Sequence, residues 1–166
     1  MNTEEARARL GQSVCDEIDS WIAKFPEKHS RSASIAALRA VQHAEGGYLS
    51  VESMDAVAAY LDLEPIAIYE IASFYSMLET SPVGRHSVSV CTNISCMLCG
   101  GEAILSHIER KLNIKVGEST PDGRIFLKRE EECLAACTQA PMMMVDHVYY
   151  TNLTTEKVDQ ILDNLE

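Results

Sequence analysis

The chain has 166 residues, of which 46% are hydrophobic, so it can bury a core in one ordinary domain or two small ones. Its formal net charge of −11 repels phosphate backbones and anionic lipid, which argues against nucleic-acid binding and favours a basic protein partner. No apolar run reaches the ~20 residues of a bilayer-spanning helix, and the N-terminal segment MNTEEARARL has no secretory or transit features, so we expect a cytoplasmic protein without direct membrane insertion.

The first 80 residues predict a small helical bundle. Apolar side chains recur every three or four residues, and Pro26, Gly46 and Gly47 stand where the runs stop. The expected helices run from Thr3 to about Phe25, over Arg31–Ala44, from the N-cap Ser50 to Leu61, and from Pro65 to Tyr75. Cys15 lies on the first of them and is expected to pack in the core.

The sequence changes character at residues 81–84, and we place the boundary between two domains, 1–80 and 81–166, there. Alternating or continuous apolar runs predict four strands, and two helices follow from apolar spacing. The expected order is a strand His86–Cys91, a helix Gly101–Leu112, strands Arg124–Lys128, Met142–Val145 and Val148–Thr151, and a helix Thr154–Leu165. This order predicts an α/β layer in which two helices cover one sheet, so the fold class of the whole chain is α+β or α/β.

Five of the six cysteines lie in the second domain, in two groups that follow the first and second strands. The groups are Cys91, Cys96 and Cys99, and Cys133 and Cys137. Chain segments that leave the same end of a sheet can meet in space. Nothing in the sequence argues for secretion, so the cysteines are more naturally metal ligands or redox groups than disulfides.

Three interpretations compete for these cysteines. A zinc site could use Cys96, Cys99, Cys133 and Cys137 as two closely spaced pairs. A thiol-disulfide oxidoreductase could use the C-x-x-C of Cys96 and Cys99, where a helix start would lower the pKa of the first thiol, but this leaves three cysteines without a role. A [2Fe–2S] cluster needs two thiolates on each iron, and Cys91-x₄-Cys96 with Cys133-x₃-Cys137 matches that need.

The residues around the cysteines also suit a cluster. Ala135 and Ala136 are small enough for backbone N–H groups to approach sulfide, and Gly100-Gly101 lets the next helix start close by. The acidic run Glu130–Glu132 would disfavour the addition of an electron, or it is simply a solvated surface.

Longer stretches resemble a known family. VCTNISCMLCGG, KLNIKVGESTPDGR and ECLAACTQAPMMMVD, with HSRSASIAALRAVQHAEGGYLS and IYEIASFYSML upstream, are similar to the thioredoxin-like [2Fe–2S] ferredoxins that include the E subunit of respiratory NADH:quinone oxidoreductase (complex I). The resemblance covers nearly the whole chain. It implies a helical bundle followed by a thioredoxin-like domain with a four-stranded sheet and two helices.

The resemblance also implies roles and partners. Cys91 and Cys96 would bind one iron of a single [2Fe–2S] cluster, and Cys133 and Cys137 the other. FMN and NADH would bind only to the partner called the F subunit, and the iron–sulfur protein called the G subunit would be a second neighbour. The chain would then be peripheral on the inner face of the cell membrane through the complex, with no catalysis of its own. Related subunits occur in NAD-dependent hydrogenases and formate dehydrogenases, which remain alternatives.

Several other residues carry weaker expectations. Cys99 has no ligand role to inherit. It could be a spare or exchangeable ligand, but we expect it to pack as a small apolar residue at a helix start. The run Met142–Met144 should supply core on one face of its strand and cover for the cluster or for a neighbouring subunit on the other. The aromatic side chains Tyr69, Phe74 and Tyr75 suit a packing stripe on a helix, with a partner interface as the alternative.

Two further residue types complete the expectations. Pro141 stands where thioredoxin-like folds often have a cis proline. The histidines lack metal-ligand spacing.

Overall fold

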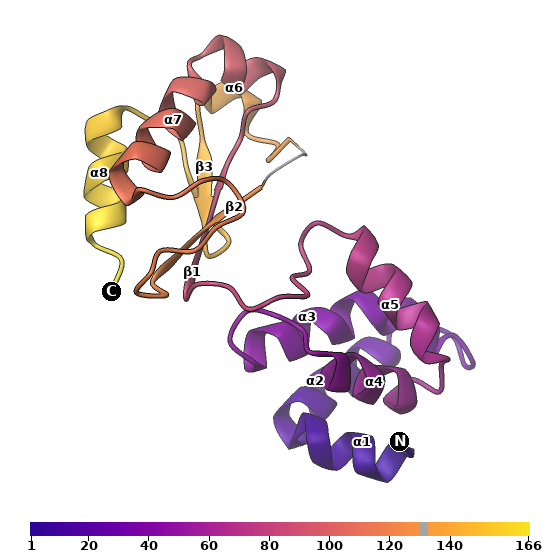
Figure 1. Ribbon diagram of the computed structural model, residues 1–166. Coiled ribbons are helices and arrows are strands. Elements are labelled where there is room, and N and C mark those ends of the chain that lie inside the picture. Colours follow the sequence, from indigo (N-terminus) through magenta and orange to yellow (C-terminus); the bar gives the residue numbers. More distant parts are fainter. Residues whose placement is uncertain (130–132) are drawn as a thin grey trace. The chain divides into compact units, whose positions relative to one another are not determined.

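The computed structural model describes residues 1–129 and 133–166. The chain forms two compact units, Met1–Pro82 and Val83–Glu166, and each has its own hydrophobic core. Figure 1 shows that the first unit is helical and that the second unit contains the sheet. The acidic run at 130–132, to which the sequence assigned an effect on the cluster, lies outside the described residues.

The first unit contains five α-helices where the sequence predicted four. They are α1 (Thr3–Leu10), α2 (Gln12–Ile22), α3 (Ser34–Ala44), α4 (Val51–Tyr60) and α5 (Pro65–Phe74), with a 3₁₀ turn, η1 (Ser30–Ala33), before α3. The single helix expected from Thr3 to Phe25 was wrong, because Gly11 has φ +81° and breaks it into α1 and α2. A residue with that φ suits glycine, so the break has a local cause in the sequence.

The helix starts follow the capping residues that the sequence contains. Asn2 and Glu5 form a reciprocal capping box at α1. The Ser50 side chain accepts a hydrogen bond from the Ser53 N–H at the start of α4, and Pro65 occupies the first turn of α5, as expected.

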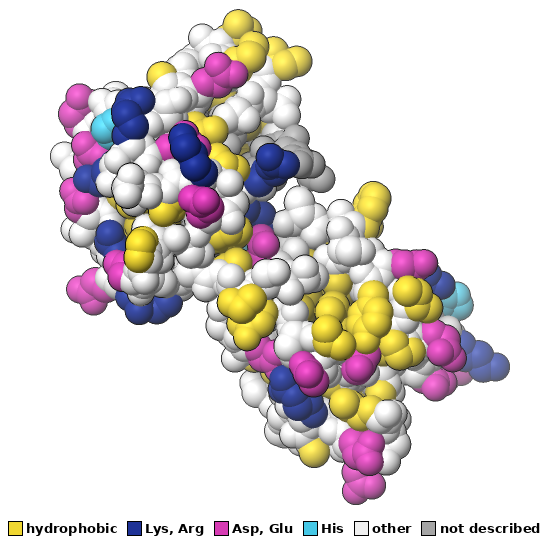
Figure 2. Space-filling view, viewed as in Figure 1, with side chains coloured by type: hydrophobic (Ala, Val, Ile, Leu, Met, Phe, Trp, Pro, Cys, Tyr) yellow, Lys and Arg dark blue, Asp and Glu magenta, His cyan; other side chains and the backbone are white. Residues whose placement is uncertain are grey.

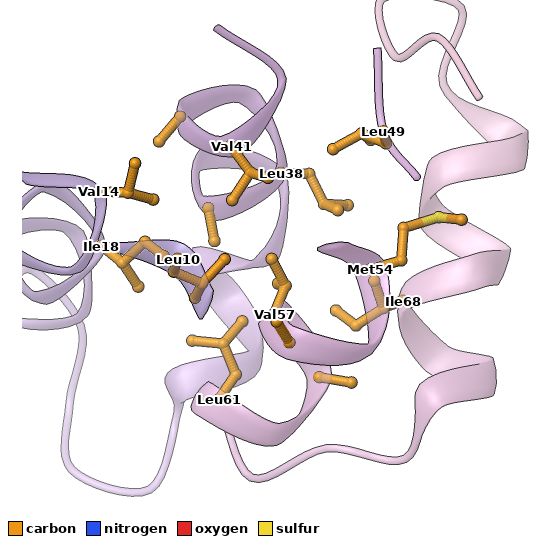
Figure 3. Close-up of a cluster of buried hydrophobic side chains, with 14 of the residues drawn as sticks. Leu10, Val14, Ile18, Leu38, Val41, Leu49, Met54, Val57, Leu61 and Ile68 are labelled. Atoms are coloured by element: carbon orange, nitrogen blue, oxygen red, sulfur yellow. The ribbon is translucent and has the colours of Figure 1, made fainter. Parts of the chain in front are cut away.

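All of these helices contribute to the core of the first unit, which Figure 3 shows in close-up. Side chains from different helices converge there: Ile18 from α2, Leu38 from α3, Val57 from α4 and Ile68 from α5 are fully buried. Cys15 is also fully buried, which confirms its expected packing role. At roughly 1.5–3 kcal/mol for each buried aliphatic side chain, this core is the main source of stability in the unit.

The second unit contains one mixed sheet of four strands. Its elements are β1 (His86–Val90), α6 (Ile94–Leu98), α7 (Gly101–Leu112), β2 (Ile125–Lys128), the 3₁₀ turn η2 (Cys137–Gln139), β3 (Met143–Val145), β4 (Val148–Tyr150) and α8 (Thr155–Asp163). The strand order is β2-β1-β3-β4, with β1 and β2 parallel and the other pairs antiparallel. The predicted strands and helices are all present, with ends that differ by one or two residues, and α6 is an addition.

The two faces of the sheet have different partners. Val88 and Val90 of β1 and Met143 of β3 pack in one core with Ile108 of α7 and Leu162 of α8. Figure 1 shows both helices on this side of the sheet. The strand periodicity of two therefore sends the alternate residues of β1 and β3 to the opposite face, and Cys91 and Met144 lie on this face.

A tight turn joins β3 to β4. Asp146 and His147 both have positive φ, 47° and 69°, as a two-residue hairpin turn of type I′ requires. In the part of the chain that the structure describes, no helix has both the length and the hydrophobicity to cross a bilayer.

Candidate metal centre

The parallel pairing of β1 and β2 brings the two cysteine groups to one edge of the sheet. Because the strands run side by side in register, the chain leaves both of them in the same direction, after Val90 and after Lys128. The Cys91 N–H then donates to the Met142 carbonyl oxygen at 3.1 Å, which extends the pairing of β1 with β3 by one residue. Both cysteine groups thus follow strands that end on the same side of the sheet, as the prediction that they can meet requires.

The first two cysteines are buried. Cys91 and Cys96 are each 1% exposed and pack with Leu134 and Met142 in a small cluster of their own. Cys96 lies within α6, whose first N–H is capped by the Asn93 side chain at 3.2 Å. The end of a strand and a short helix therefore hold this pair in place.

The second pair, Cys133 and Cys137, is exposed. Their Sγ atoms lie 3.3 Å apart, which is well beyond the ~2.05 Å of a disulfide bond. The Ala135 N–H donates to the Cys133 Sγ at 3.4 Å, and Ala135 has φ +62°, an uncommon conformation for a residue other than glycine. This backbone conformation directs the Ala135 N–H at a cysteine sulfur, whereas its expected approach to the sulfide of a cluster stays a prediction.

The two pairs lie near one another. Leu134, from the loop of the exposed pair, packs against Cys91 and Cys96. Burial, followed by a hydrogen bond to Cys91, raises the pKa of Cys96 to about 11, and the charge of Cys133 contributes to the same rise. A backbone hydrogen bond from Met142 opposes it. Among residues 1–129 and 133–166, no three His, Cys, Asp or Glu side chains form a ready-made metal site, so the thiols stand as two adjacent pairs.

Gly101 allows the close packing of α7 on this site. A Cβ atom at this position would lie 2.8 Å from the Cys91 carbonyl oxygen and 2.9 Å from that of Cys96. Such distances are too short for any side chain, so the need for a small residue at the start of α7 is confirmed. Gly100, with φ +91°, supplies the left-handed turn between α6 and α7.

Cys99 differs from its expected role. It is the C-cap residue of α6 and is exposed, so the prediction that it packs as a small apolar residue was wrong. The thiol-disulfide interpretation also loses support, because a reactive thiol needs a lowered pKa and Cys96 has a raised one. The zinc interpretation pairs Cys96 with Cys99, whereas the hydrogen-bonded neighbour of Cys96 is Cys91.

The three methionines at and just before the start of β3 behave as expected. Met143 is buried on the helix-covered face, while Met142 and Met144 pack beside the cysteines on the other. The peptide bond between Ala140 and Pro141 is cis.

The aromatic residues of α5 split into two groups. Tyr69 packs against the core and donates from its hydroxyl to Asp55, whereas Phe74 is 79% exposed, so the packing stripe was wrong for Phe74.

Sequence reasoning missed one feature of the site, the exposed apolar surface of α6. Ile94, Met97 and Leu98 are 70%, 43% and 76% exposed, directly beside Cys96. The signal was present as three apolar residues between the cysteines. A helix of five residues is too short for a helical periodicity to stand out, so the spacing alone does not predict it.

A four-stranded mixed sheet with helices on one face, and with two pairs of cysteines after its parallel strands, is typical of a protein of thioredoxin-like architecture. Residues 18–166 match the family model described as thioredoxin-like [2Fe–2S] ferredoxin. The chain belongs to this family, which confirms the predicted fold class and implies a [2Fe–2S] cluster as the cofactor.

Named relatives agree with this assignment. The chain is 42% identical over 149 residues to the second of the NADH-quinone oxidoreductase E subunits of Rhizobium meliloti (strain 1021), covering 90% of this chain and 86% of that protein. It is 35% identical over 166 residues to the NADH-quinone oxidoreductase E subunit of Rickettsia conorii (strain ATCC VR-613 / Malish 7), covering 100% of this chain and 99% of that protein.

A solved structure shares the fold. An NAD⁺-reducing [NiFe]-hydrogenase in its air-oxidised state superposes with a TM-score of 0.67 at 22% sequence identity. The match covers 80% of this chain and 22% of the hydrogenase chain.

Proposed function

We propose that this chain is the electron-transfer E subunit of an NADH:quinone oxidoreductase, and that Cys91, Cys96, Cys133 and Cys137 hold its single [2Fe–2S] cluster. The observation that carries the proposal is that two parallel strands lead both cysteine pairs to one end of the sheet, where Leu134 of the second loop packs against Cys91 and Cys96. The names of relatives that match this chain over most of its length support the same role.

The residues present fit such a cluster. Two sulfurs on one tetrahedral metal, with bonds of about 2.3 Å, lie about 3.8 Å apart, and Cys133 and Cys137 are already 3.3 Å apart. Cys91 and Cys96 would hold one iron, and Cys133 and Cys137 the other. Four thiolates are the ligand set that this type of cluster requires.

When bound, a [2Fe–2S] cluster supplies a site that takes up and gives back one electron. Its oxidised form with four thiolates has a formal charge of about −2, which the protein must stabilise in a partly buried place. The N–H groups of Ala135 and Met142 already point at cysteine sulfur and can do this. No side chain has to act as an acid, base or nucleophile, so activity should appear only in the complex.

The proposed partners are the FMN- and NADH-binding F subunit and the iron–sulfur G subunit. The exposed apolar surface of α6 lies next to the proposed cluster and suits burial by a partner through which the electron passes. The helical unit offers further exposed apolar side chains, Ile66, Phe74 and Met77. Figure 2 shows hydrophobic side chains gathered on the visible face of this unit and at the α6 end of the other. Through these partners the chain would lie at the inner face of the cell membrane.

Purified holoprotein tests the proposal directly. An anaerobic preparation should be reddish-brown, contain two irons and two sulfides per chain, and give the electron paramagnetic resonance signal of a reducible cluster. Cys91→Ser should abolish the signal, while Cys99→Ser, the matched control in the same loop, should keep it. A colourless chain with one zinc, or one with a disulfide between Cys96 and Cys99, would overturn the proposal.

A second purification identifies the complex. A tagged chain isolated from gently solubilised membranes should bring the F and G subunits with it. The superposed hydrogenase shows the fold alone, but the co-purification of hydrogenase subunits instead would move the chain to that class of complex.

A further inference from the structure

A buried hydroxyl in the centre of the sheet has no partner. Ser89 of β1 is 1% exposed, and its Oγ is the one buried side-chain nitrogen or oxygen that makes no hydrogen bond in the described part of the chain. Leaving such a group unpaired is unfavourable, and buried polar groups in proteins nearly always have a partner. The hydroxyl therefore points to a partner that the polypeptide does not provide.

The pairing of the strands places Ser89 on the same face of the sheet as the cysteines. Cys91 follows it by two residues and continues the pairing with β3, so their side chains leave the strand on the same side. Val88 and Val90, the residues on either side of Ser89, pack in the helix-covered core on the other face. Ser89 is thus the first side chain along β1 behind the Cys91 ligand.

The neighbours of Ser89 in the sheet leave its hydrogen unused. Ser89 lies opposite Lys128 of β2 and opposite Met144 of β3. An ammonium group has only donors, and a thioether is a weak acceptor, so neither suits an O–H donor. Met144 itself packs against the buried side chains of Cys91, Cys96, Leu134 and Met142. The β3 neighbour of Ser89 is therefore in contact with the cysteine site.

We propose that the Ser89 hydroxyl donates a hydrogen bond to the sulfur atoms of the bound [2Fe–2S] cluster and thereby raises its reduction potential. The inference rests on the proposed function, because it needs the cluster as its acceptor. Sulfide and thiolate are acceptors without hydrogens of their own, and the hydroxyl is a donor without an acceptor. Reduction adds negative charge to the cluster, so a donor stabilises the reduced form more than the oxidised form.

Redox titration of the full chain with its cluster, followed by electron paramagnetic resonance, tests this role. In Ser89→Ala the reduction equilibrium should shift about tenfold towards the oxidised form, which corresponds to a midpoint lower by about 59 mV for one electron. Ser89→Thr retains the hydroxyl and should keep the wild-type midpoint. Ser87→Ala removes a hydroxyl from the same face of β1, two residues further from Cys91, and should also leave the midpoint unchanged.

Electron–nuclear double resonance provides a second measurement, which begins with the wild-type protein. The reduced wild-type cluster should show a coupled proton that exchanges in D₂O, and this coupling should be absent from Ser89→Ala. Equal midpoints and equal couplings in wild type and Ser89→Ala would overturn the inference, even if the substitution changed the unfolding of the iron-free chain. A wild-type chain without iron would instead overturn the proposed function.

Discussion

The two cysteine pairs are held in different ways. Cys91 and Cys96 are buried against Leu134 and Met142, at the end of a strand and within a helix. Cys133 and Cys137 are exposed, and their sulfurs contact each other and one backbone N–H. The buried pair is therefore part of the hydrophobic structure of the protein, whereas the exposed pair is positioned by the local backbone of its loop.

This difference separates the contribution of a cysteine to the stability of the fold from its contribution to metal binding. In the proposed site, a buried thiol would both stabilise the fold through packing and bind iron. An exposed thiol would do little for the iron-free fold and would act mainly as a ligand. Substitutions in the two pairs should have the same effect on the cluster and different effects on the protein without it.

The largest expected effect comes from serine substitutions in both pairs. Cys91→Ser and Cys137→Ser should each remove the cluster. In the iron-free chain, Cys91→Ser places a hydroxyl in an apolar site and should lower the free energy of unfolding by about 1–3 kcal/mol, while Cys137→Ser should change it by less than about 0.5 kcal/mol. Urea unfolding of both variants measures this, and equal losses of stability would remove the proposed distinction between the pairs.

The next effect concerns the helix that packs on the buried pair. Gly101→Ala would bring a methyl group to 2.8 Å from the Cys91 carbonyl oxygen and should cost about 1–3 kcal/mol of stability. Gly84→Ala is a matched control, because its methyl group would lie 2.7 Å from the backbone of Ile125, away from the cysteines.

Both glycine variants should melt earlier in thermal unfolding, but only Gly101→Ala should take up less iron during cluster reconstitution. Similar iron contents in the two variants would show that the buried pair tolerates a displaced α7.

The pH dependence of thiol reactivity should separate the pairs without any substitution. Burial raises the pKa of Cys96 from its ordinary value of 9.0 to about 11, so its thiol stays protonated to a higher pH than an ordinary thiol does. In the iron-free chain, iodoacetamide should modify Cys99, Cys133 and Cys137 first, and Cys96 only as the pH approaches 11. Peptide mass spectrometry follows each site, and early modification of Cys96 at a pH of about 8 would contradict the burial argument.

The same pKa sets a trend in stability. The folded state keeps its Cys96 proton above pH 9, where an unfolded thiol loses it, so the folded state binds more protons in this range. The free energy of unfolding of the iron-free chain should therefore fall as the pH rises from about 9 to 11. Cys96→Ala should flatten this fall, which urea unfolding at several pH values would detect.

The sequence predicted the order of strands and helices in the second unit well because its signals are local and strong. Alternating residues such as Val88 and Val90 identify a strand. The structure pairs this strand, β1, with β2 in parallel, and the chain therefore leaves both strands at the end where Cys91 and Cys133 follow. The resemblance to a known family contributed the choice among three metal or redox interpretations. The family match confirms that choice for the cofactor.

The features that the sequence did not predict depend on tertiary structure or on a single residue. The apolar spacing continues across Gly11, so periodicity suggested one helix where a positive φ breaks it. Cysteine and phenylalanine are residue types that favour burial, yet Cys99 and Phe74 are exposed. Their exposure depends on which face of a helix packs against other elements, and this is a property of the tertiary structure. Ser89 is one polar residue in an alternating strand, and only its missing hydrogen bond distinguishes it.

The smallest expected effect tests whether the contrast between the cysteine pairs belongs to the second unit alone. We propose that residues 81–166 form a domain that folds by itself, because they include both pairs, the sheet and the core that α7 and α8 complete. A fragment of residues 81–166 should keep two irons and the resonance spectrum of the full chain, and should lose only the partner contacts that the helical unit provides. A fragment that folds but binds no iron would show that the helical unit takes part in holding one of the pairs.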